Sequence, residues 1–259
     1  MDKVTIVKIG GNVIDSAEAF APFMAEFAKL EGKKILVHGG GKIATRLAKQ
    51  MEVETTMIEG RRVTDRAMLD IVTMTYAGVI NKNVVATLQS HGCNAIGLSG
   101  ADGNAVKATK RPANPIDFGF VGDIDPANVN AEFLMTLLDA GVTPVFCAIM
   151  HNGEGDLLNC NADTVASSVA LGMSRVAPTE LIFCFEKKGV LTDVDDDSSV
   201  IKSITPENYA SFKADGAIHS GMIPKIDGAL KAVSQGVSRV TIKHSEDLLD
   251  SEAGTTIKG

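Results

Sequence analysis

The residues best suited to chemistry lie in and around two glycine-rich turns, Gly10-Gly11 and Gly39-Gly40-Gly41. Each turn follows an apolar run typical of a buried strand and precedes a segment with a helical pattern. At such a junction, backbone N–H groups and the helix dipole face an anion, and glycine allows that anion to approach closely. Two such turns on successive parallel strands open at the same edge, so we favour an anion site over two purely structural turns.

Three cationic side chains have positions that suit such an anion. Lys8 lies inside an apolar strand, two residues before Gly10, and lysine is rarely buried without a partner. Arg62, in GRRVTD, has a guanidinium that can bind a carboxylate through two hydrogen bonds, whereas we expect Arg61 to be a surface residue. Lys225, in GMIPK, enters a predicted helix, and its position alone favours neither a functional nor a structural role.

A polar cluster at Asn159, Asn161 and Asp163 precedes another predicted helix. One such residue suffices as an N-cap, so we expect the others to line a site. His38 ends a strand just before the second glycine turn, and we favour a packed, hydrogen-bonded histidine over a catalytic base. We expect no metal held by protein ligands, because the histidines lack metal-site spacing and the four cysteines form no CxxC.

The elements that must position these residues alternate between strands and helices. The apolar and helical patterns predict strands at 4–9, 34–38, 93–98, 105–109, 143–149, 180–185 and 238–243. They predict helices at 15–29, 42–51, 66–90, 125–141, 162–172, 206–214 and 222–235, with a hairpin around Glu59-Gly60. Asp15 and Glu18 suggest a capping box for the first helix, and Gly92 a C-cap for the third. Such alternation predicts an α/β fold with a mainly parallel sheet covered on both faces, and a soft boundary near Pro178 suggests two lobes, 1–177 and 178–259.

Composition narrows the class of protein further. The 259 residues are 45% apolar and carry a formal net charge of −7, from 25 basic and 32 acidic residues. We therefore expect a soluble globular protein, and the acidic balance without a Lys/Arg run argues against nucleic-acid binding. No apolar run is long enough for a membrane span, and the start MDKVTIVKIGG lacks the pattern of a signal peptide. These features predict no membrane partner, a cytoplasmic location and reduced cysteines.

Five motifs occur together in a fixed order along the chain: KIGG at 8–11, HGGGK at 38–42, GRRVTD at 60–65, LNCNAD at 158–163 and GMIPK at 221–225. This ordered set resembles the amino acid kinase superfamily and, within it, the N-acetylglutamate kinases, over essentially the whole chain. Aspartate kinases carry an added regulatory region that this length excludes. UMP kinases and glutamate 5-kinases begin with different turns and lack the pairing of RVTD with LNxNAD.

The resemblance implies a three-layer α/β/α sandwich and an activity. An enzyme of this kind transfers a phosphoryl group from ATP to the γ-carboxylate of N-acetylglutamate, or of another N-acylglutamate, in arginine biosynthesis. Residues 1–177 would bind the acylated amino acid and form the contact of a homodimer, with the helix at 66–90 at the interface. Residues 178–259 would bind ATP, whose phosphates carry Mg²⁺.

The resemblance also implies roles for individual residues. Lys8 would stabilise the γ-phosphoryl group and Lys225 the leaving diphosphate, while Asp163 would hold both lysines in place. Arg62 and Asn159 would bind the substrate's α-carboxylate, with Asn161 in the same pocket. Backbone amides would come from the two glycine turns, with Gly10 and Gly11 on the phosphate side and Gly40 and Gly41 at the substrate.

Two alternative functions remain open at this point. A kinase acting on the longer N-acyl-aminoadipate of lysine synthesis would show much the same motifs. A non-catalytic paralogue would be expected to have lost Lys8, Asp163 or Lys225, and all three are present. Glu186–Gly189 departs from the usual turn of the family beside the nucleotide, and there we expect Lys187 and Lys188 to face solvent rather than a phosphate.

Overall fold

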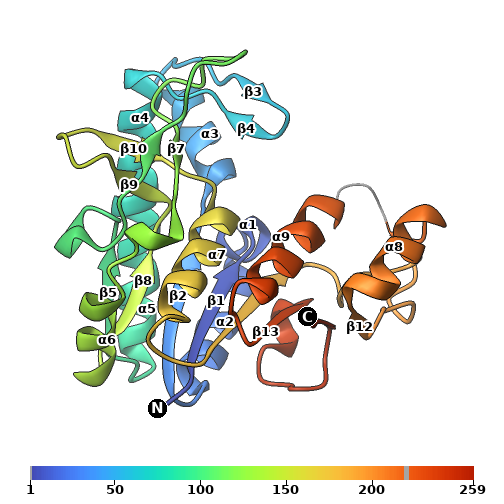
Figure 1. Ribbon diagram of the computed structural model, residues 1–259. Coiled ribbons are helices and arrows are strands. Elements are labelled where there is room, and N and C mark those ends of the chain that lie inside the picture. Colours follow the sequence, from blue (N-terminus) through green and yellow to red (C-terminus); the bar gives the residue numbers. More distant parts are fainter. Residues whose placement is uncertain (1, 219–221) are drawn as a thin grey trace.

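The protein is built around one eight-stranded sheet, seen in a computed structural model that describes residues 2–218 and 222–259 (Figure 1). In spatial order the strands are β12 (Ser203–Ile204), β14 (Thr255–Ile257), β13 (Arg239–His244), β11 (Thr179–Phe185), β1 (Val4–Ile9), β2 (Lys33–His38), β8 (Thr143–Phe146) and β5 (Ala95–Leu98). All neighbours are parallel except β13 and β14. The expected mainly parallel sheet is confirmed. Strands from before and after Pro178 belong to the same continuous sheet.

Helices cover both faces of this sheet and complete the three-layer sandwich that the motifs imply. One layer contains α6 (Ala131–Asp139), α7 (Ala162–Met173) and α9 (Ile223–Ser234), which pack side by side in front of the sheet in Figure 1. The opposite layer includes α2 (Ala17–Lys29) and α5 (Asn81–Ser90), which contact each other behind it. The remaining helices are α1 (Gly11–Asp15), α3 (Gly41–Gln50), α4 (Arg66–Thr73), the π-helix η1 (Met74–Ile80), α8 (Pro206–Ala214) and the 3₁₀ turns η2 (Asp102–Asn104), η3 (Pro126–Asn128) and η5 (Ser245–Asp247).

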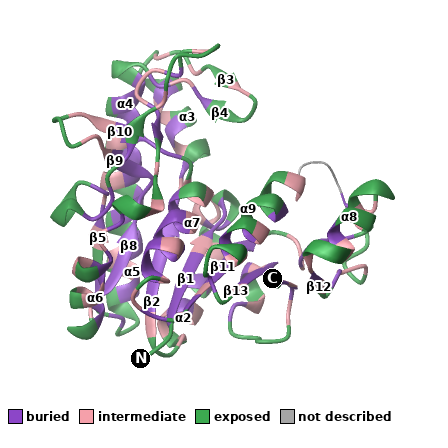
Figure 2. Ribbon diagram, in the orientation of Figure 1, coloured by how far each residue is buried: buried purple, intermediate pink, exposed green. Residues whose placement is uncertain are grey.

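The core lies on both faces of the central strands (Figure 2). Ile6, Ile9, Ile35 and Leu36 are fully buried, because β1 and β2 have helices above and below them. Burial on both faces explains why these strands are continuous apolar runs rather than alternating ones. Lys8 is the one charged residue of β1, and the cost of burying it points to a specific partner.

Three short two-stranded sheets extend beyond the carboxyl ends of the central strands. They are β3 (Met57–Ile58) with β4 (Arg61–Arg62), β6 (Thr109–Lys110) with β7 (Gly122–Asp123), and β9 (Ile149–His151) with β10 (Leu157–Asn159). The first is the expected hairpin, and its turn residues Glu59 and Gly60 have φ of 49° and 75°. Positive φ at both turn positions is what a two-residue hairpin with a type I′ turn requires.

The expected helix at 15–29 begins differently in the structure. Asp15 ends the short helix α1, and Ser16 is the N-cap of α2, accepting a hydrogen bond from the backbone N–H of Ala19. The predicted capping box of Asp15 with Glu18 is therefore wrong. Asp15 is already the last residue of α1, so the next residue, Ser16, takes the capping position.

The predicted helix at 66–90 forms as one continuous rod of three parts, α4, η1 and α5, followed by Gly92 at φ 75°. Its middle, η1, is π-helical, which a 3.6-residue apolar period does not reveal. The predicted helix at 125–141 instead divides into η3, capped by Asp125, and α6, capped by Asn130. Two caps five residues apart explain the break, because each side chain bonds to backbone N–H groups of its own turn.

Several strand limits also differ from expectation. The apolar run 143–149 divides into β8 and the start of β9, which leaves the sheet to pair with β10. Of 105–109, only Thr109 lies in a strand. β12 and β14 were not expected, because segments of two and three residues carry too little pattern. All four cysteines are free and buried, as expected, and none of the described helices is long and apolar enough to cross a membrane.

Candidate active site

The two glycine turns lie side by side at one edge of the sheet. β1 and β2 are adjacent and parallel, with Ile9 opposite His38, so Gly10 and Gly39 leave the sheet together. Gly40 then caps α3 with φ 151°, a conformation open mainly to glycine. A Cβ atom on Gly40 would lie 2.1 Å from Cδ1 of the buried Ile80 in η1, so a larger residue here would also have to displace that side chain.

An ion pair joins the two central candidates beside these turns. Nζ of Lys8 lies 2.6 Å from Oδ1 of Asp163, with the side chains 16% and 33% exposed. Asp163 lies in the first turn of α7, where Asn161 is the N-cap and accepts hydrogen bonds from the N–H groups of Asp163 and Thr164. The cap thus orients the carboxylate toward β1. A half-buried lysine held in this way presents a localised positive charge at the edge of the sheet.

Lys225 lines a large cavity together with Asp163 of this pair. It is in the first turn of α9, with Nζ 4.6 Å from the centre of the Phe185 ring. Asp163 and Lys225 both line this cavity of about 690 Å³, but among the described residues Asp163 forms an ion pair with Lys8 and not with Lys225. Gly221, the first residue of the GMIPK motif, lies outside the described residues.

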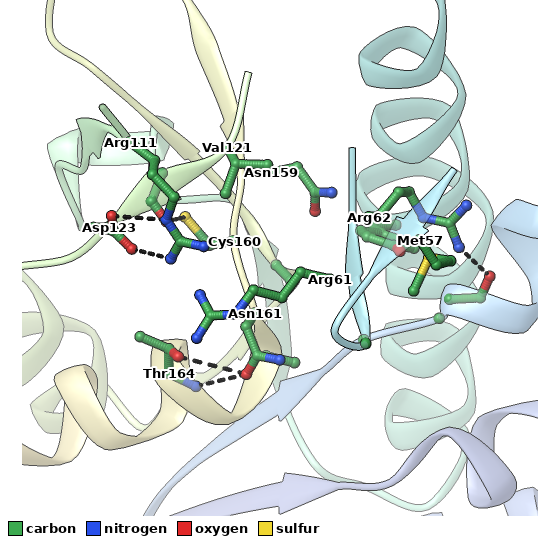
Figure 3. A pocket seen from close by; sticks show the side chains of 18 residues that line it. Met57, Arg61, Arg62, Arg111, Val121, Asp123, Asn159, Cys160, Asn161 and Thr164 are labelled. Carbon is green, nitrogen blue, oxygen red and sulfur yellow. Dashed lines mark hydrogen bonds and ion pairs between the residues drawn. The ribbon is translucent and has the colours of Figure 1, made fainter. Parts of the chain in front are cut away.

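A second, smaller cavity of about 210 Å³ opens beside the second glycine turn (Figure 3). It is lined by Gly39–Gly41, and Gly60, Arg61, Asn161 and Thr164 line both it and the large cavity. The two cavities therefore adjoin. This arrangement allows two ligands to meet at the carboxyl edge of β1 and β2.

Arg62 is 8% exposed and lines the smaller cavity. Its Nη2 donates to the carbonyl of Gly41 at 3.0 Å and to Oγ1 of Thr45 at 2.8 Å, so it points toward α3 in Figure 3. Among the described residues it has no carboxylate within ion-pair distance. A buried cation without an acidic partner favours an anionic ligand, because desolvating the charge otherwise costs free energy.

The asparagines of the polar cluster have distinct surroundings. Asn159 is buried, and its Nδ2 donates to Oγ1 of Thr64 at 3.0 Å. Asn161 serves both as the N-cap and as a wall residue of both cavities, so the two roles considered for this cluster coexist. Between them, Cys160 is buried against the carbonyl of Gly122, and burial raises the pKa of its thiol to about 12. That thiol stays protonated near neutral pH.

Two further arginines line the smaller cavity: Arg61, which is exposed as expected but also lines the large cavity, and Arg111, which the sequence pattern does not single out. Arg61 points toward Asn161 and Thr164, opposite to Arg62, because neighbouring side chains of a strand alternate in direction (Figure 3). That alternation was visible in the sequence. Arg111 is paired through two hydrogen bonds with Asp123 on β7, and only the tertiary structure brings it to the cavity.

Three other candidates have structural surroundings. His38 is fully buried and hydrogen-bonded, and burial lowers its pKa to about 4, which confirms a packed histidine. Lys187 donates to the carbonyl of Val194 at 2.8 Å, and Lys188 lies 3.3 Å from a carboxylate oxygen of Asp247. Both lysines contact their own part of the chain and stay partly exposed, with 44% of the Lys188 side chain accessible, in keeping with the expectation that they face solvent rather than a phosphate.

Comparisons with known proteins agree along the whole chain. A sequence profile described as the amino acid kinase family matches residues 3–244. An acetylglutamate kinase of Cytophaga hutchinsonii is 50% identical over 251 residues, covering 96% of this chain and 94% of the relative. An acetylglutamate kinase of Phocaeicola vulgatus is 47% identical over 257 residues, covering 99% of each chain.

Solved structures share the fold. The crystal structure of smu.665 from Streptococcus mutans UA159 has a TM-score of 0.76 at 28% identity and covers 98% of each chain. The carbamate kinase of Giardia has a TM-score of 0.71 at 13% identity, covering 99% of each chain, a likeness of fold alone. With the sandwich, the two glycine turns and the Lys8–Asp163 pair in place, the chain belongs to the amino acid kinase family.

Proposed function

We propose that this protein transfers the γ-phosphoryl group of ATP to the γ-carboxylate of N-acetyl-L-glutamate. A carboxylate oxygen forms a bond to Pγ, the bond from Pγ to the bridging oxygen breaks, and the products are an acyl phosphate and ADP. Curated relatives with 42–50% identity bear the name acetylglutamate kinase. The observation that carries the proposal is the Lys8–Asp163 ion pair beside two glycine turns, where two cavities adjoin.

The smaller cavity suits the acylated amino acid. Arg62 supplies a buried positive charge without an acidic partner, and Asn159 adds a buried amide at the same wall. We assign both to the α-carboxylate of the substrate, with Asn161 and the amides of Gly40 and Gly41 nearer the reacting carboxylate. Since that carboxylate is already ionised at neutral pH, the reaction requires no general base.

The larger cavity has the size and charge for the nucleotide. Lys225 lines this cavity, and we assign it to the leaving diphosphate. We assign Lys8, which pairs with the cavity residue Asp163, and the amides of Gly10 and Gly11 to the γ-phosphoryl group. Phosphoryl transfer depends mainly on positioning and on positive charge around the transferring group. The described residues include no cluster of three acidic, histidine or cysteine side chains able to hold a metal, so we expect Mg²⁺ to be bound by the ATP phosphates and to neutralise their charge.

The same proposal extends to organisation and setting. We assign binding of the acid and dimerisation to residues 1–177 and ATP binding to residues 178–259. A homodimer in the cytoplasm, acting in arginine biosynthesis, follows from the resemblance to N-acetylglutamate kinases.

A coupled assay of ADP release tests the activity. The acceptors are N-acetyl-L-glutamate, N-acetyl-L-glutamate esterified at its α-carboxyl, N-acyl-glutamates with longer acyl groups, and N-acetyl-aminoadipate. We expect the largest kcat/KM with an N-acyl-glutamate, and loss of activity when the α-carboxylate is blocked. A higher kcat/KM with N-acetyl-aminoadipate, or no ADP release with any acid, would contradict the proposal.

A further inference from the structure

Two buried polar side chains lie directly behind the second glycine turn. His38 ends β2 and Asn81 begins α5, and they are 0% and 1% exposed. Nδ2 of Asn81 lies 3.0 Å from Nε2 of His38, and Nδ1 of His38 lies 2.8 Å from the carbonyl oxygen of Gly39. Neither side chain lines either cavity, so their role must act through the turn.

The chemistry of the partners determines the direction of each hydrogen bond. The carbonyl of Val145, 2.9 Å from Nδ2 of Asn81, can only accept, so the amide nitrogen faces it. The ammonium of Lys82 can only donate, and it lies 3.2 Å from Oδ1 of Asn81. Asn81 therefore donates its second proton to Nε2 of His38, which leaves the ring proton on Nδ1, donating to Gly39.

Burial in addition favours the neutral form of the ring over the charged form. Desolvation lowers the pKa of His38 to about 4, the hydrogen bond to Gly39 opposes that shift, and the charge of Lys82 adds to it. A proton on Nε2 would face the donating amide of Asn81. The imidazole is thus neutral near pH 7, with one orientation and one set of partners.

The anchored carbonyl determines where the next N–H group points. In a trans peptide the C=O and N–H bonds point in opposite directions, and the Gly39–Gly40 peptide is trans. Because the carbonyl of Gly39 faces the His38 ring, the N–H of Gly40 faces away from it. Gly40 and Gly41 are the N-cap and first residue of α3, so their N–H groups have no partner within the helix, and both residues line the smaller cavity.

We infer that His38 and Asn81 are positioning residues, which aim the N–H of Gly40 at the charge that develops during phosphoryl transfer. The inference rests on the proposed function. A hydrogen-bond donor that is oriented in advance stabilises a transition state without reorganisation, so its effect falls on kcat more than on substrate binding. Ile80, the residue before Asn81, packs against Gly40. The segment Ile80-Asn81 therefore both packs against the glycine turn and, through His38, orients it.

Two isosteric substitutions separate the two hydrogen bonds of the ring. In His38→Asn the amide nitrogen replaces Nδ1 and keeps the donor to Gly39. In His38→Gln the amide lies where Nε2 was, so the contact with Asn81 is kept and the donor to Gly39 is lost. We expect His38→Gln to lower kcat ~10-fold or more, the scale of a misaimed transition-state contact, with the KM for ATP nearly unchanged. His38→Asn should restore most of that kcat.

Exposed His91 provides the matched control, because His91→Gln makes the same chemical change outside the site. Thermal unfolding of each variant separates a loss of folding from a loss of rate. Equal kcat in His38→Asn and His38→Gln, or a change confined to the unfolding temperature, would overturn the inference.

Nitrogen NMR of the histidine ring tests the same arrangement without any kinase assay. We expect a neutral His38 protonated at Nδ1 at pH 7, and a Gly40 amide resonance that shifts on adding N-acetyl-L-glutamate in the wild type but not in His38→Gln. An Nε2-protonated ring would refute the positioning role even if the enzyme is active. An inactive wild type whose ring is protonated at Nδ1 would instead count against the proposed function.

Discussion

Single residues at this site differ mainly in how their charges are balanced. Lys8 is paired with Asp163 at 2.6 Å, whereas Arg62 is buried among neutral acceptors. A paired lysine is held in one position, which suits a contact with a transition state. An unpaired buried arginine suits a contact with a ligand that brings its own negative charge.

Substituting Lys8 by arginine should lower kcat far more than it raises either KM. The guanidinium keeps the charge but moves it by about an ångström or more, and such misplacement of a transition-state contact costs ~10²-fold in rate. Steady-state kinetics measures the effect, and Lys3→Arg, at an exposed lysine paired with Glu180, is the control. A Lys8→Arg enzyme with half of the wild-type kcat would remove Lys8 from the site.

Replacing Arg62 by alanine should chiefly weaken binding of the acylated amino acid. A charged hydrogen bond contributes roughly 1.5–3 kcal/mol, so the KM for the acid should rise about 10- to 100-fold while that for ATP stays nearly unchanged. Arg66→Ala, at an exposed arginine paired with Asp156, is the control. A rise in the KM for ATP alone would mean that the two ligands have been assigned to the wrong cavities.

At the scale of elements, the site depends on the register of β1 with β2 and on the rod formed by α4, η1 and α5. The register brings the two glycine turns together, and η1 packs Ile80 against Gly40. A π-helical turn adds a residue to the helical turn, and such segments are often found at functional sites. Here η1 ends at Ile80, and the next residue, Asn81, hydrogen-bonds to His38.

Gly40→Ala should destabilise the protein and abolish most of the activity, because the added Cβ would lie 2.1 Å from Cδ1 of Ile80. Gly32→Ala is the matched control: its φ of 80° is also positive, but nothing lies within 4 Å of the added Cβ. We expect Gly32→Ala to cost about 1–2 kcal/mol of backbone strain with normal kcat. Chemical denaturation and steady-state kinetics on both variants compare the effect of backbone strain alone, in Gly32→Ala, with that of backbone strain and a steric clash together, in Gly40→Ala. Equal effects of the two variants would show that η1 does not restrict the turn.

At the scale of the whole molecule, one continuous sheet carries both cavities. β11, in the half to which we assign ATP binding, lies beside β1, whose Lys8 pairs with Asp163. The outer surface of the rod formed by α4, η1 and α5 exposes two apolar side chains, Met74 at 45% and Val79 at 57%. Exposed apolar groups on one helix fit the dimer contact that we propose for this segment.

Val79→Glu should therefore convert the dimer into a monomer, because a charge buried in an apolar interface is costly. Light scattering measures the mass, which we expect to be twice that of one chain for the wild type. Val194→Glu, at a residue 48% exposed in the other half of the chain, should leave the dimer intact. A wild-type monomer, or a Val79→Glu dimer, would exclude this interface.

The stability of the folded protein should fall as the pH decreases from about 6.5 toward 4. The pKa of His38 is lowered by burial from 6.5 to about 4, so the unfolded chain binds a proton in this range that the folded chain does not. The loss of stability from this group is negligible above pH 6.5 and grows to on the order of 3 kcal/mol at pH 4. Urea unfolding of wild type and His38→Asn measures it, since asparagine does not titrate. Parallel pH profiles for the two proteins would contradict the buried neutral histidine.

What the sequence determined by itself is the order and type of the principal elements and the set of residues that could carry the chemistry. Buried parallel strands are recognisable as apolar runs, and glycines between strand and helix mark the turns, because both patterns are local. Lys8 and the Asn159–Asp163 cluster stood out for the same reason: charged or polar groups in apolar surroundings need partners.

Only the tertiary structure decided which of these residues meet. The family motifs imply that Asp163 holds both lysines, but only the structure shows that, among the described residues, it pairs with Lys8 alone while Lys225 lies over Phe185. The sequence could not place Arg111 in the smaller cavity, or show that a π-helical turn packs against Gly40. Packing between distant segments sets these contacts, and local propensity is too weak to specify them.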